Sequence, residues 1–165
     1  MRKIVMPFRP HPDGAIFMLH WLQQLLSRDK SDSSPAGACG AEGERLAAEF
    51  LHNRIGYEVV VQNWRNPQDR REEIDLVCRD REVLVFVEVK TRSADAQVAG
   101  FFAVDRRKKQ ALRRAIHAYL TQLRFRPRTF RFDVAEVILA GNIPPQVLHF
   151  QNVPLFPKGY HVLRQ

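Results

Sequence analysis

The chain has 165 residues, of which 45% are apolar and 27% charged, a balance that is typical of globular proteins and excludes a disordered or fibrous one. This length predicts one compact domain of about 120 to 130 residues with a tail. Lys and Arg number 26 against 18 Asp and Glu, so the formal net charge is +8. Such a charge favours a polyanionic partner.

The cysteine content and the longest apolar run indicate where the protein works. Cys39 and Cys78 are too few for a disulfide framework and lack the spacing of a zinc site, so we expect a reducing, cytoplasmic location. A membrane-spanning helix needs roughly 18 to 20 apolar residues, and no stretch reaches that length. We therefore expect no membrane partner.

Residues 1–40 are predicted to form an N-terminal extension. Residues 1–14 hold three prolines and no periodic apolar pattern, and residues 27–40 have the small, polar composition of a flexible linker. Apolar residues at helical spacing over 15–26 predict a short amphipathic helix. A signal peptide is the competing interpretation, which Pro7, Pro10 and Pro12 disfavour. A start codon assigned too far upstream would give a similar extension.

Residues 41–140 are predicted to form the folded domain, and residues 141–165 a last strand and a tail. In chain order the patterns predict a helix over 42–54 ended by Gly56, strands over 57–64, 73–78 and 83–91, a helix over 105–123, and strands over 130–139 and 146–150. This order indicates an α/β fold, with a mixed sheet flanked by helices.

The positive charge is concentrated in one segment. Residues 105–131 contain ten basic residues and one acidic residue, a net charge of +9, whereas the rest of the chain has a net charge of −1. Such a basic ridge suits phosphate contacts, although a solvated helix face would look the same. Lys108 lies one turn before the inward Leu112, so we expect it to act as a phosphate clamp or as a counter-charge.

Acidic residues gather on the predicted hairpin of residues 73–91. Alternation along a strand places Glu73 and Asp75 on one face, and likewise Glu88 and Lys90. If Cys78 pairs with about Val83, Asp75 lies opposite Phe86 and diagonal to Glu88, with roughly 5 to 8 Å between Cβ atoms.

Two carboxylates at this separation can hold one divalent ion. Mg²⁺ prefers oxygen ligands and is often bound through one or two carboxylates plus substrate phosphate. On the first helix, Glu44 flanks the buried stripe and could reach the same site. The alternative is a set of cross-strand ion pairs with no chemical role.

Several motifs, in order, resemble the bacterial YraN family of endonuclease-like proteins. They are Gly43-Glu44-Arg45-Leu46-Ala47-Ala48, Gly56-Tyr57, Asn63-Trp64-Arg65, Glu73-Ile74-Asp75-Leu76-Val77, Phe86-Val87-Glu88-Val89-Lys90-Thr91-Arg92, Val104-Asp105 with Lys108, and Arg131-Phe132-Asp133-Val134. That family is similar to archaeal Holliday-junction resolvases within the PD-(D/E)xK nucleases, which share the restriction-endonuclease-like α/β fold.

The resemblance implies roles for charged residues of the hairpin and of the first helix. Asp75 and Glu88 would be metal-binding catalytic carboxylates, with Glu44 as a further acidic ligand, and Lys90 would orient or activate the attacking water. Glu73 matches an additional acidic position of the family. We also predict nucleic-acid binding by basic residues, which are Lys108, Arg106, Arg107, Lys109, Arg113 and Arg92.

One departure from the family pattern affects the loop before Asp75. Glu72 stands where the family usually has glycine. Because glycine permits positive φ, we expect the local backbone to differ from that of the family.

Together these features predict a Mg²⁺- or Mn²⁺-dependent endonuclease that hydrolyses phosphodiester bonds in structured or branched DNA. The alternative is a non-catalytic nucleic-acid-binding adaptor that keeps the nuclease scaffold and works with a DNA-processing partner. A homodimer would suit the cleavage of two strands.

Overall fold

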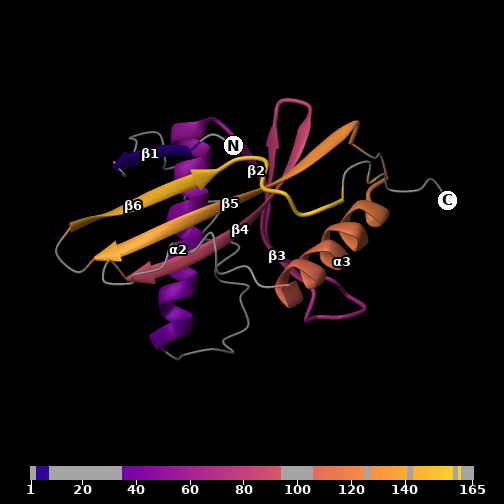
Figure 1. Cartoon of the computed structure of the whole chain (residues 1–165), viewed down its shortest axis with the longest axis horizontal. Coiled ribbons are helices and arrows are strands. Elements are labelled where there is room, and N and C mark those ends of the chain that lie inside the picture. The colour runs from indigo at the N-terminus through magenta and orange to yellow at the C-terminus, as the bar shows by residue number, and fades with distance from the viewer. Residues whose placement is uncertain are drawn as a thin grey trace.

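The computed structural model describes residues 3–7, 35–93, 106–124, 127–140, 143–157 and 160. Its elements, shown in Figure 1, are β1 (Lys3–Pro7), α2 (Pro35–Phe50), a π-helical turn η1 (Leu51–Ile55), β2 (Glu58–Arg65), β3 (Glu73–Asp80), β4 (Val83–Ser93), α3 (Arg106–Gln122), β5 (Thr129–Ala140) and β6 (Ile143–Phe150). The predicted α/β class is confirmed, as is the order helix, three strands, helix and two strands.

The strands form one mixed sheet in the order β1-β6-β5-β4-β3-β2. β4 and β5 are parallel, and α3 lies between them in the chain, as a crossover between parallel strands requires. The other neighbouring pairs are antiparallel. β4 has partners on both sides, and its residues 84–89 are all buried, which explains its nearly continuous apolar sequence.

The two α-helices in the described part of the chain, α2 and α3, cover opposite faces of this sheet. On one face, Leu46 and Phe50 of α2 pack with Val85 of β4, and on the other Leu112 of α3 packs with Phe86 of β4. Because successive side chains of a strand point to opposite faces, β4 contributes alternate residues to each core. Figure 1 shows α2 crossing the sheet and α3 lying beside β3.

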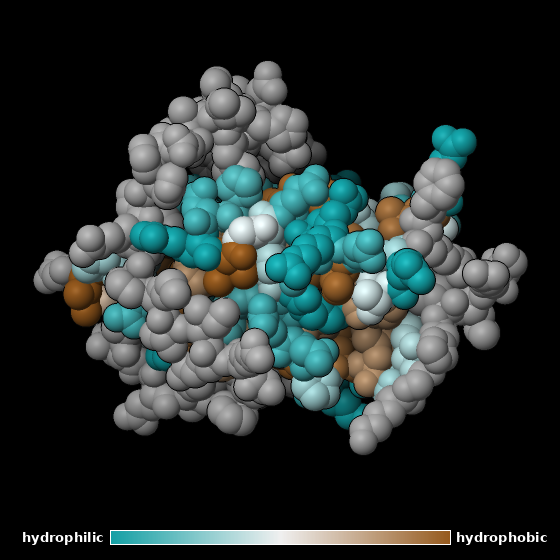
Figure 2. Space-filling view, turned by 90° about the horizontal axis from the view of Figure 1, so that it is seen from above, coloured by the Kyte–Doolittle hydropathy of each residue, from teal (hydrophilic) through white to brown (hydrophobic). Residues whose placement is uncertain are grey.

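The surface is consistent with a sheet buried between helices. Figure 2 shows a largely hydrophilic described surface on one face of the molecule, with small separate apolar patches. No helix in the described part of the chain is both long enough and apolar enough to span a membrane.

Gly56 ends the first helical segment as predicted. It adopts a left-handed φ of 83°, which glycine accommodates without a Cβ clash, and its N–H donates to His52 O at 3.2 Å. The Tyr57 N–H donates to Leu51 O at 2.9 Å, so the last carbonyls of the helix have partners and the chain turns into β2.

The described part of the N-terminal extension contains one strand that was not predicted and the start of a helix where a linker was predicted. Residues 3–7 form β1, which pairs with β6 from Lys3↔Phe150 to Pro7↔Gln146; pairing through the backbone needs no periodic apolar pattern. The linker predicted over 27–40 is helical from Pro35 onward, since proline fits the first turn of a helix and alanines support the turns that follow. The helix predicted over 15–26 lies outside the described residues.

Candidate functional site

Strands β3 and β4 bring Asp75 and Glu88 together. Their register runs from Asp80↔Val83 to Leu76↔Val87, and continuing it by one residue places Asp75 opposite Glu88. Asp75 Oδ2 accepts a hydrogen bond of 2.7 Å from the Val89 N–H. The carboxylate thus takes the position of a backbone acceptor where the ladder between the strands ends.

The predicted register of this hairpin is wrong by two residues. β3 continues to Asp80, and only Arg81 and Glu82 separate it from β4, so Cys78 pairs with Val85 and not with Val83. Val77, and not Asp75, lies opposite Phe86. The shorter turn changes the relation of Asp75 to Glu88 from diagonal to directly opposite, which brings the two carboxylates closer.

Glu88 is the most enclosed charge of the site. It is 1% exposed, and alternation with Phe86 places it on the face of the sheet that α3 covers. Glu88 Oε1 accepts from Lys90 Nζ at 2.7 Å and lies 3.1 Å from Lys108 Nζ. Glu88 Oε2 is buried and has no hydrogen-bond partner. A buried carboxylate oxygen without a partner is unfavourable, so this atom fits a ligand such as a cation.

The charges shift the pKa of the neighbouring groups. Burial, followed by the negative charges of Glu88 and Glu44, raises the pKa of Asp75 to about 8, although the Val89 N–H and Lys108 act against this shift. Burial alone would lower the pKa of Lys108, but Glu88 and Asp75 raise it above its ordinary value. Asp75 therefore holds its proton to a higher pH than an ordinary aspartic acid, because burial and the nearby carboxylates disfavour its charged form.

Close packing of α2 on β4 positions Glu44. A Cβ added to Gly43 would lie 1.8 Å from Thr91 Oγ1 and 2.9 Å from Thr91 Cβ, so the helix backbone lies directly against the strand at this point. Glu44 follows at once in the chain and acts electrostatically on Asp75. Position 43 has no room for a side chain, and the motif alone did not reveal this need for glycine.

The described residues form a pair of carboxylates but no complete metal cage. Among them, no group of three or more His, Cys, Asp and Glu side chains is placed to hold a metal ion. A cation between Asp75 and Glu88 would therefore take its other ligands from water or substrate. This is the coordination that Mg²⁺ commonly keeps in proteins.

Glu73 does not join the enclosed part of the site. Its side chain is 41% exposed and pairs with Arg65 at 3.4 Å. Its charge still acts on Lys108 and raises that pKa, so Glu73 lies at the outer margin of the site.

The predicted nucleic-acid-binding residues occupy different environments. Arg106 and Arg107 are exposed at the start of α3, Lys109 is half-buried, and Lys108 pairs with Glu88 as the predicted counter-charge. Arg92 pairs with the buried Glu136. The Nε of Arg113 donates to Leu155 O at 2.6 Å.

The sequence analysis did not predict that two further carboxylates near the site, Glu72 and Glu136, are buried and pair with basic residues. Glu72 accepts from Arg114 at 2.7 Å and from Asn66 at 2.9 Å, and its φ is not positive, so the family's glycine is not needed here. Glu136 lies beside Lys90 in the parallel register of β4 and β5. Glu136 lies two residues after Val134 on β5, and this spacing could have indicated that both side chains point to the same buried face.

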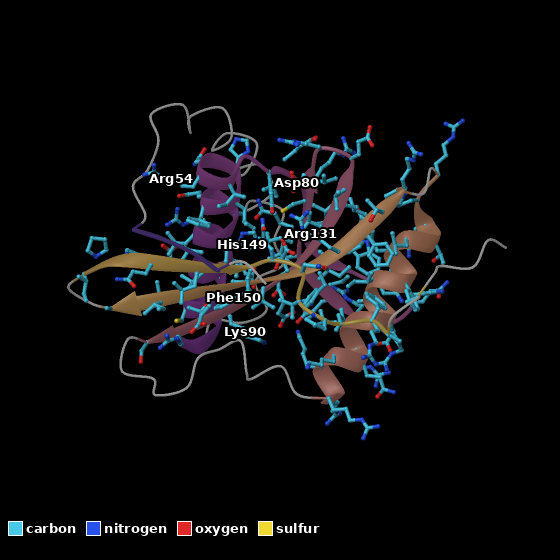
Figure 3. The ribbon with its side chains drawn as sticks, turned by 45° about the horizontal axis from the view of Figure 1, so that its top comes forward. Arg54, Asp80, Lys90, Arg131, His149 and Phe150 are labelled. Atoms are coloured by element: carbon cyan, nitrogen blue, oxygen red, sulfur yellow. The ribbon has the colours of Figure 1, made fainter. Side chains whose placement is uncertain are left out.

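Arg131 does not belong to the basic ridge, contrary to the prediction from the charge of residues 105–131. It pairs with Asp80 at 3.0 Å and with Asp133 at 3.1 Å, and Asp133 also contacts His149 at 3.0 Å. Asp133 and His149 are completely buried. Figure 3 labels Asp80, Arg131 and His149. Asp133 alternates along β5 with Val134, which packs toward α3, so this network lies on the face of the sheet opposite Glu88 and is separate from the site.

Comparison with known proteins identifies the family. A UPF0102 protein of Beutenbergia cavernae is 43% identical over 116 residues, which are 70% of this chain and 95% of that protein. One from Paenarthrobacter aurescens is 40% identical over 114 residues, or 69% and 91% of the two chains. UPF0102 protein STH1475 of Symbiobacterium thermophilum is 44% identical over 98 residues, or 59% and 80%.

The model of the "Uncharacterised protein family UPF0102" matches residues 43–137, which include Glu44, Asp75, Glu88 and Lys90. YraN and UPF0102 denote one family, so the family resemblance of the motifs is confirmed. The chain therefore belongs to the UPF0102 family.

Proposed function

We propose that this protein is a metal-dependent nuclease that hydrolyses phosphodiester bonds in structured or branched DNA. The observation that carries the proposal is the pairing of the half-buried Asp75 with the buried Glu88, with Lys90 held at 2.7 Å from Glu88. The expected relationship of the family to archaeal Holliday-junction resolvases would favour a branched substrate. Neither the family name nor the names of the relatives assigns an activity.

Asp75 and Glu88 would hold a Mg²⁺ or Mn²⁺ ion, with Glu44 as a further acidic ligand. Bound there, such an ion lowers the pKa of a coordinated water and stabilises negative charge on a phosphate. The partnerless Glu88 Oε2 supports this assignment, since a cation would satisfy a buried oxygen that the protein leaves without a hydrogen bond.

Lys90 and Lys108 have separate tasks in this proposal. Glu88 fixes the Lys90 ammonium at the carboxylate pair, where it orients the attacking water for in-line approach to phosphorus. Lys108 lies in the first turn of α3 and balances Glu88 in the free protein. It can turn to a substrate phosphate as that anion arrives.

Helix α3 would bind the DNA backbone. It carries six Lys and Arg residues and no Asp or Glu, and Arg106 and Arg107 are exposed at the end nearest the site. Contacts of this kind do not read sequence, and their affinity falls steeply as salt rises. An affinity for junction DNA that stays flat between 50 and about 200 mM salt would exclude this role for α3.

A second candidate, a non-catalytic DNA-binding adaptor, is favoured by one observation. Both ammonium groups, Lys90 and Lys108, lie on the same oxygen of Glu88, as in a structural ion-pair network. Such a protein would bind DNA beside a processing enzyme and cut nothing.

The test is incubation of the purified protein with labelled four-way junction, splayed-arm and linear duplex DNA, in Mg²⁺, in Mn²⁺ and in EDTA. The proposal expects cutting that requires the metal and is fastest on the junction. Salt-sensitive binding without cutting in either metal would favour the adaptor. Cutting that persists in EDTA would exclude metal-dependent hydrolysis.

A further inference from the structure

A groove of about 410 Å³ lies beside α3. Glu72, just before β3, borders the groove, and so does Tyr160 of the C-terminal segment. This volume is within the range of small-ligand sites, and a nucleotide would fit in it. The residues that line it are Glu72, Arg113, Arg114, His117, Ala118 and Tyr160. Neither the proposed chemistry nor the predicted binding residues, apart from Arg113, account for this set.

Both guanidinium groups of the groove are held in place through one nitrogen. Arg113 Nε donates to Leu155 O at 2.6 Å, and Arg114 Nε donates to Glu72 Oε1 at 2.7 Å. Among the described residues these are the hydrogen bonds that the two guanidinium groups make, so their Nη atoms remain available. A guanidinium fixed in this way presents a planar pair of donors, which matches the geometry of a phosphate.

Glu72 acts as an anchor and does not repel an anion strongly. Its side chain is 9% exposed, and its other oxygen, Oε2, accepts from Asn66 Nδ2 at 2.9 Å. Both carboxylate oxygens are therefore occupied, and Arg114 balances the charge. The positive charge of Arg113 is left without a paired carboxylate, so the groove favours an anion.

Tyr160 supplies an aromatic surface beside these cations. Its ring stacks on Phe156 with centroids 4.4 Å apart and an interplanar angle of 28°. Phe156 packs edge-on against Phe130 at 5.5 Å, which ties the pair to β5. A supported ring next to two guanidinium groups is the combination by which proteins stack unpaired bases while holding the adjoining phosphate.

The groove also lies on a path from the carboxylate site. Arg106, Arg113 and His117 are separated by seven and four residues, which places them on one face of α3. From Arg106 to Arg113 the rise along a helix is about 10 Å. Figure 3 shows nitrogen-bearing side chains along α3. A strand that leaves the carboxylate pair could follow this face to the groove.

We propose that the groove binds one nucleotide of a single-stranded DNA segment, with its phosphate on Arg113 and Arg114 and its base stacked on Tyr160. The proposal rests on the proposed function for the class of substrate, and it adds that the substrate carries an unpaired strand. A paired base in a duplex has both faces stacked, so it cannot use Tyr160 in this way.

The test measures binding of fluorescent dodecathymidylate and of a blunt duplex to the full chain in EDTA, by anisotropy. Tyr160→Leu keeps an apolar side chain against Phe156 but removes the π face, so affinity for the single strand should fall roughly 5- to 100-fold. Tyr160→Phe should stay within about two-fold of the parent, because it keeps the ring.

Duplex binding separates a local effect from a general one. The proposal expects Tyr160→Leu to leave duplex affinity unchanged, and an equal loss on both ligands would overturn it. Unchanged single-strand binding by Tyr160→Leu would also overturn it. Competition by free thymidine monophosphate at a concentration similar to the oligonucleotide would assign the groove to mononucleotides, and tighter binding of dodecauridylate would assign it to RNA.

Photocrosslinking locates the base without a variant that could disturb folding. Dodecathymidylate with one 5-iodouracil should crosslink to Tyr160, as read by mass spectrometry of the digested protein, and crosslinks confined to other residues would contradict the proposal. These readouts are independent of cleavage. If the protein cuts no DNA but binds single strands through Tyr160, the proposed function is wrong and the proposed site stands. If it cuts DNA but does not bind single strands through Tyr160, the proposed function stands and the proposed site is wrong.

Discussion

Gly43 of α2 lies so close to Thr91 of β4 that a Cβ at position 43 would be 1.8 Å from Thr91 Oγ1 and 3.0 Å from Thr91 Cγ2. Rotation of the threonine side chain cannot relieve the contact, because Thr91 Cβ would still be 2.9 Å away. The packing of helix on strand therefore depends on the absence of a side chain at residue 43. The next residue, Glu44, takes its place near Asp75 from this packing.

Gly43→Ala should lower the free energy of unfolding by about 1–3 kcal/mol, because the added methyl group overpacks the contact with Thr91. The displaced helix should also carry Glu44 away from Asp75 and slow any metal-dependent cutting. Urea denaturation measures the first effect. The matched control is Gly40→Ala in the same helix, where an added Cβ meets nothing within 4 Å and stability should be unchanged or slightly higher. Equal stability of the two variants would exclude the packing explanation.

The raised pKa of Asp75, about 8 in the folded protein against an ordinary value of 3.8, makes stability depend on pH. Between these values the unfolded chain has lost this proton and the folded protein has kept it, so stability should fall as the pH rises from about 4 to about 8. Asp75→Asn has no such proton. In EDTA its Tm should exceed that of the parent at pH 8, and the gap should close toward pH 5.

Repeating the Tm measurement with Mg²⁺ tests whether Asp75 binds the metal. Mg²⁺ should raise the Tm of the parent at pH 8 and leave the Tm of Asp75→Asn nearly unchanged, since the variant lacks one of the two carboxylates. Parallel pH profiles for parent and variant in EDTA would show that Asp75 does not carry the shifted proton.

Glu72 and Glu73 are neighbours in the chain with opposite environments, and they should differ in their contribution to stability. Glu72→Ala should lower the free energy of unfolding by about 1–3 kcal/mol, because the buried Asn66 amide and Arg114 lose their acceptor. Glu73→Ala removes only an exposed pair with Arg65 and should change it by less than about 1 kcal/mol. Chemical denaturation of the two variants gives the comparison, and a larger loss for Glu73→Ala would contradict the assigned environments.

The helices, the strands and the glycine at the end of the first helical segment could be predicted because each depends on a local pattern. Apolar residues at a 3.6 period predicted α3 to within a residue of its bounds, and alternation predicted that Glu88 and Lys90 share a face. Gly56 was recognisable because a left-handed φ at a helix end favours glycine.

The register of the hairpin could not be predicted because its turn has no glycine or asparagine. Arg81 takes a left-handed φ of 55°, which a residue with a long side chain rarely adopts, so the two-residue turn leaves no trace in the sequence. The opposition of Asp75 to Glu88 follows from that turn. The arginine partners of Glu72 and Glu136, which are Arg114 and Arg92, lie more than forty residues away in the chain, and only the fold brings them together.

The most direct test of the nuclease is single-turnover cleavage of a labelled four-way junction by the parent and by Asp75→Asn, in Mg²⁺, with binding to the same junction measured in parallel. The account predicts that the variant cuts at least about 100-fold more slowly, because a metal-binding carboxylate is lost, while its affinity stays the same or rises as a negative charge is removed from the DNA site. Equal cleavage rates for the two proteins would remove Asp75, and with it the carboxylate pair, from the mechanism.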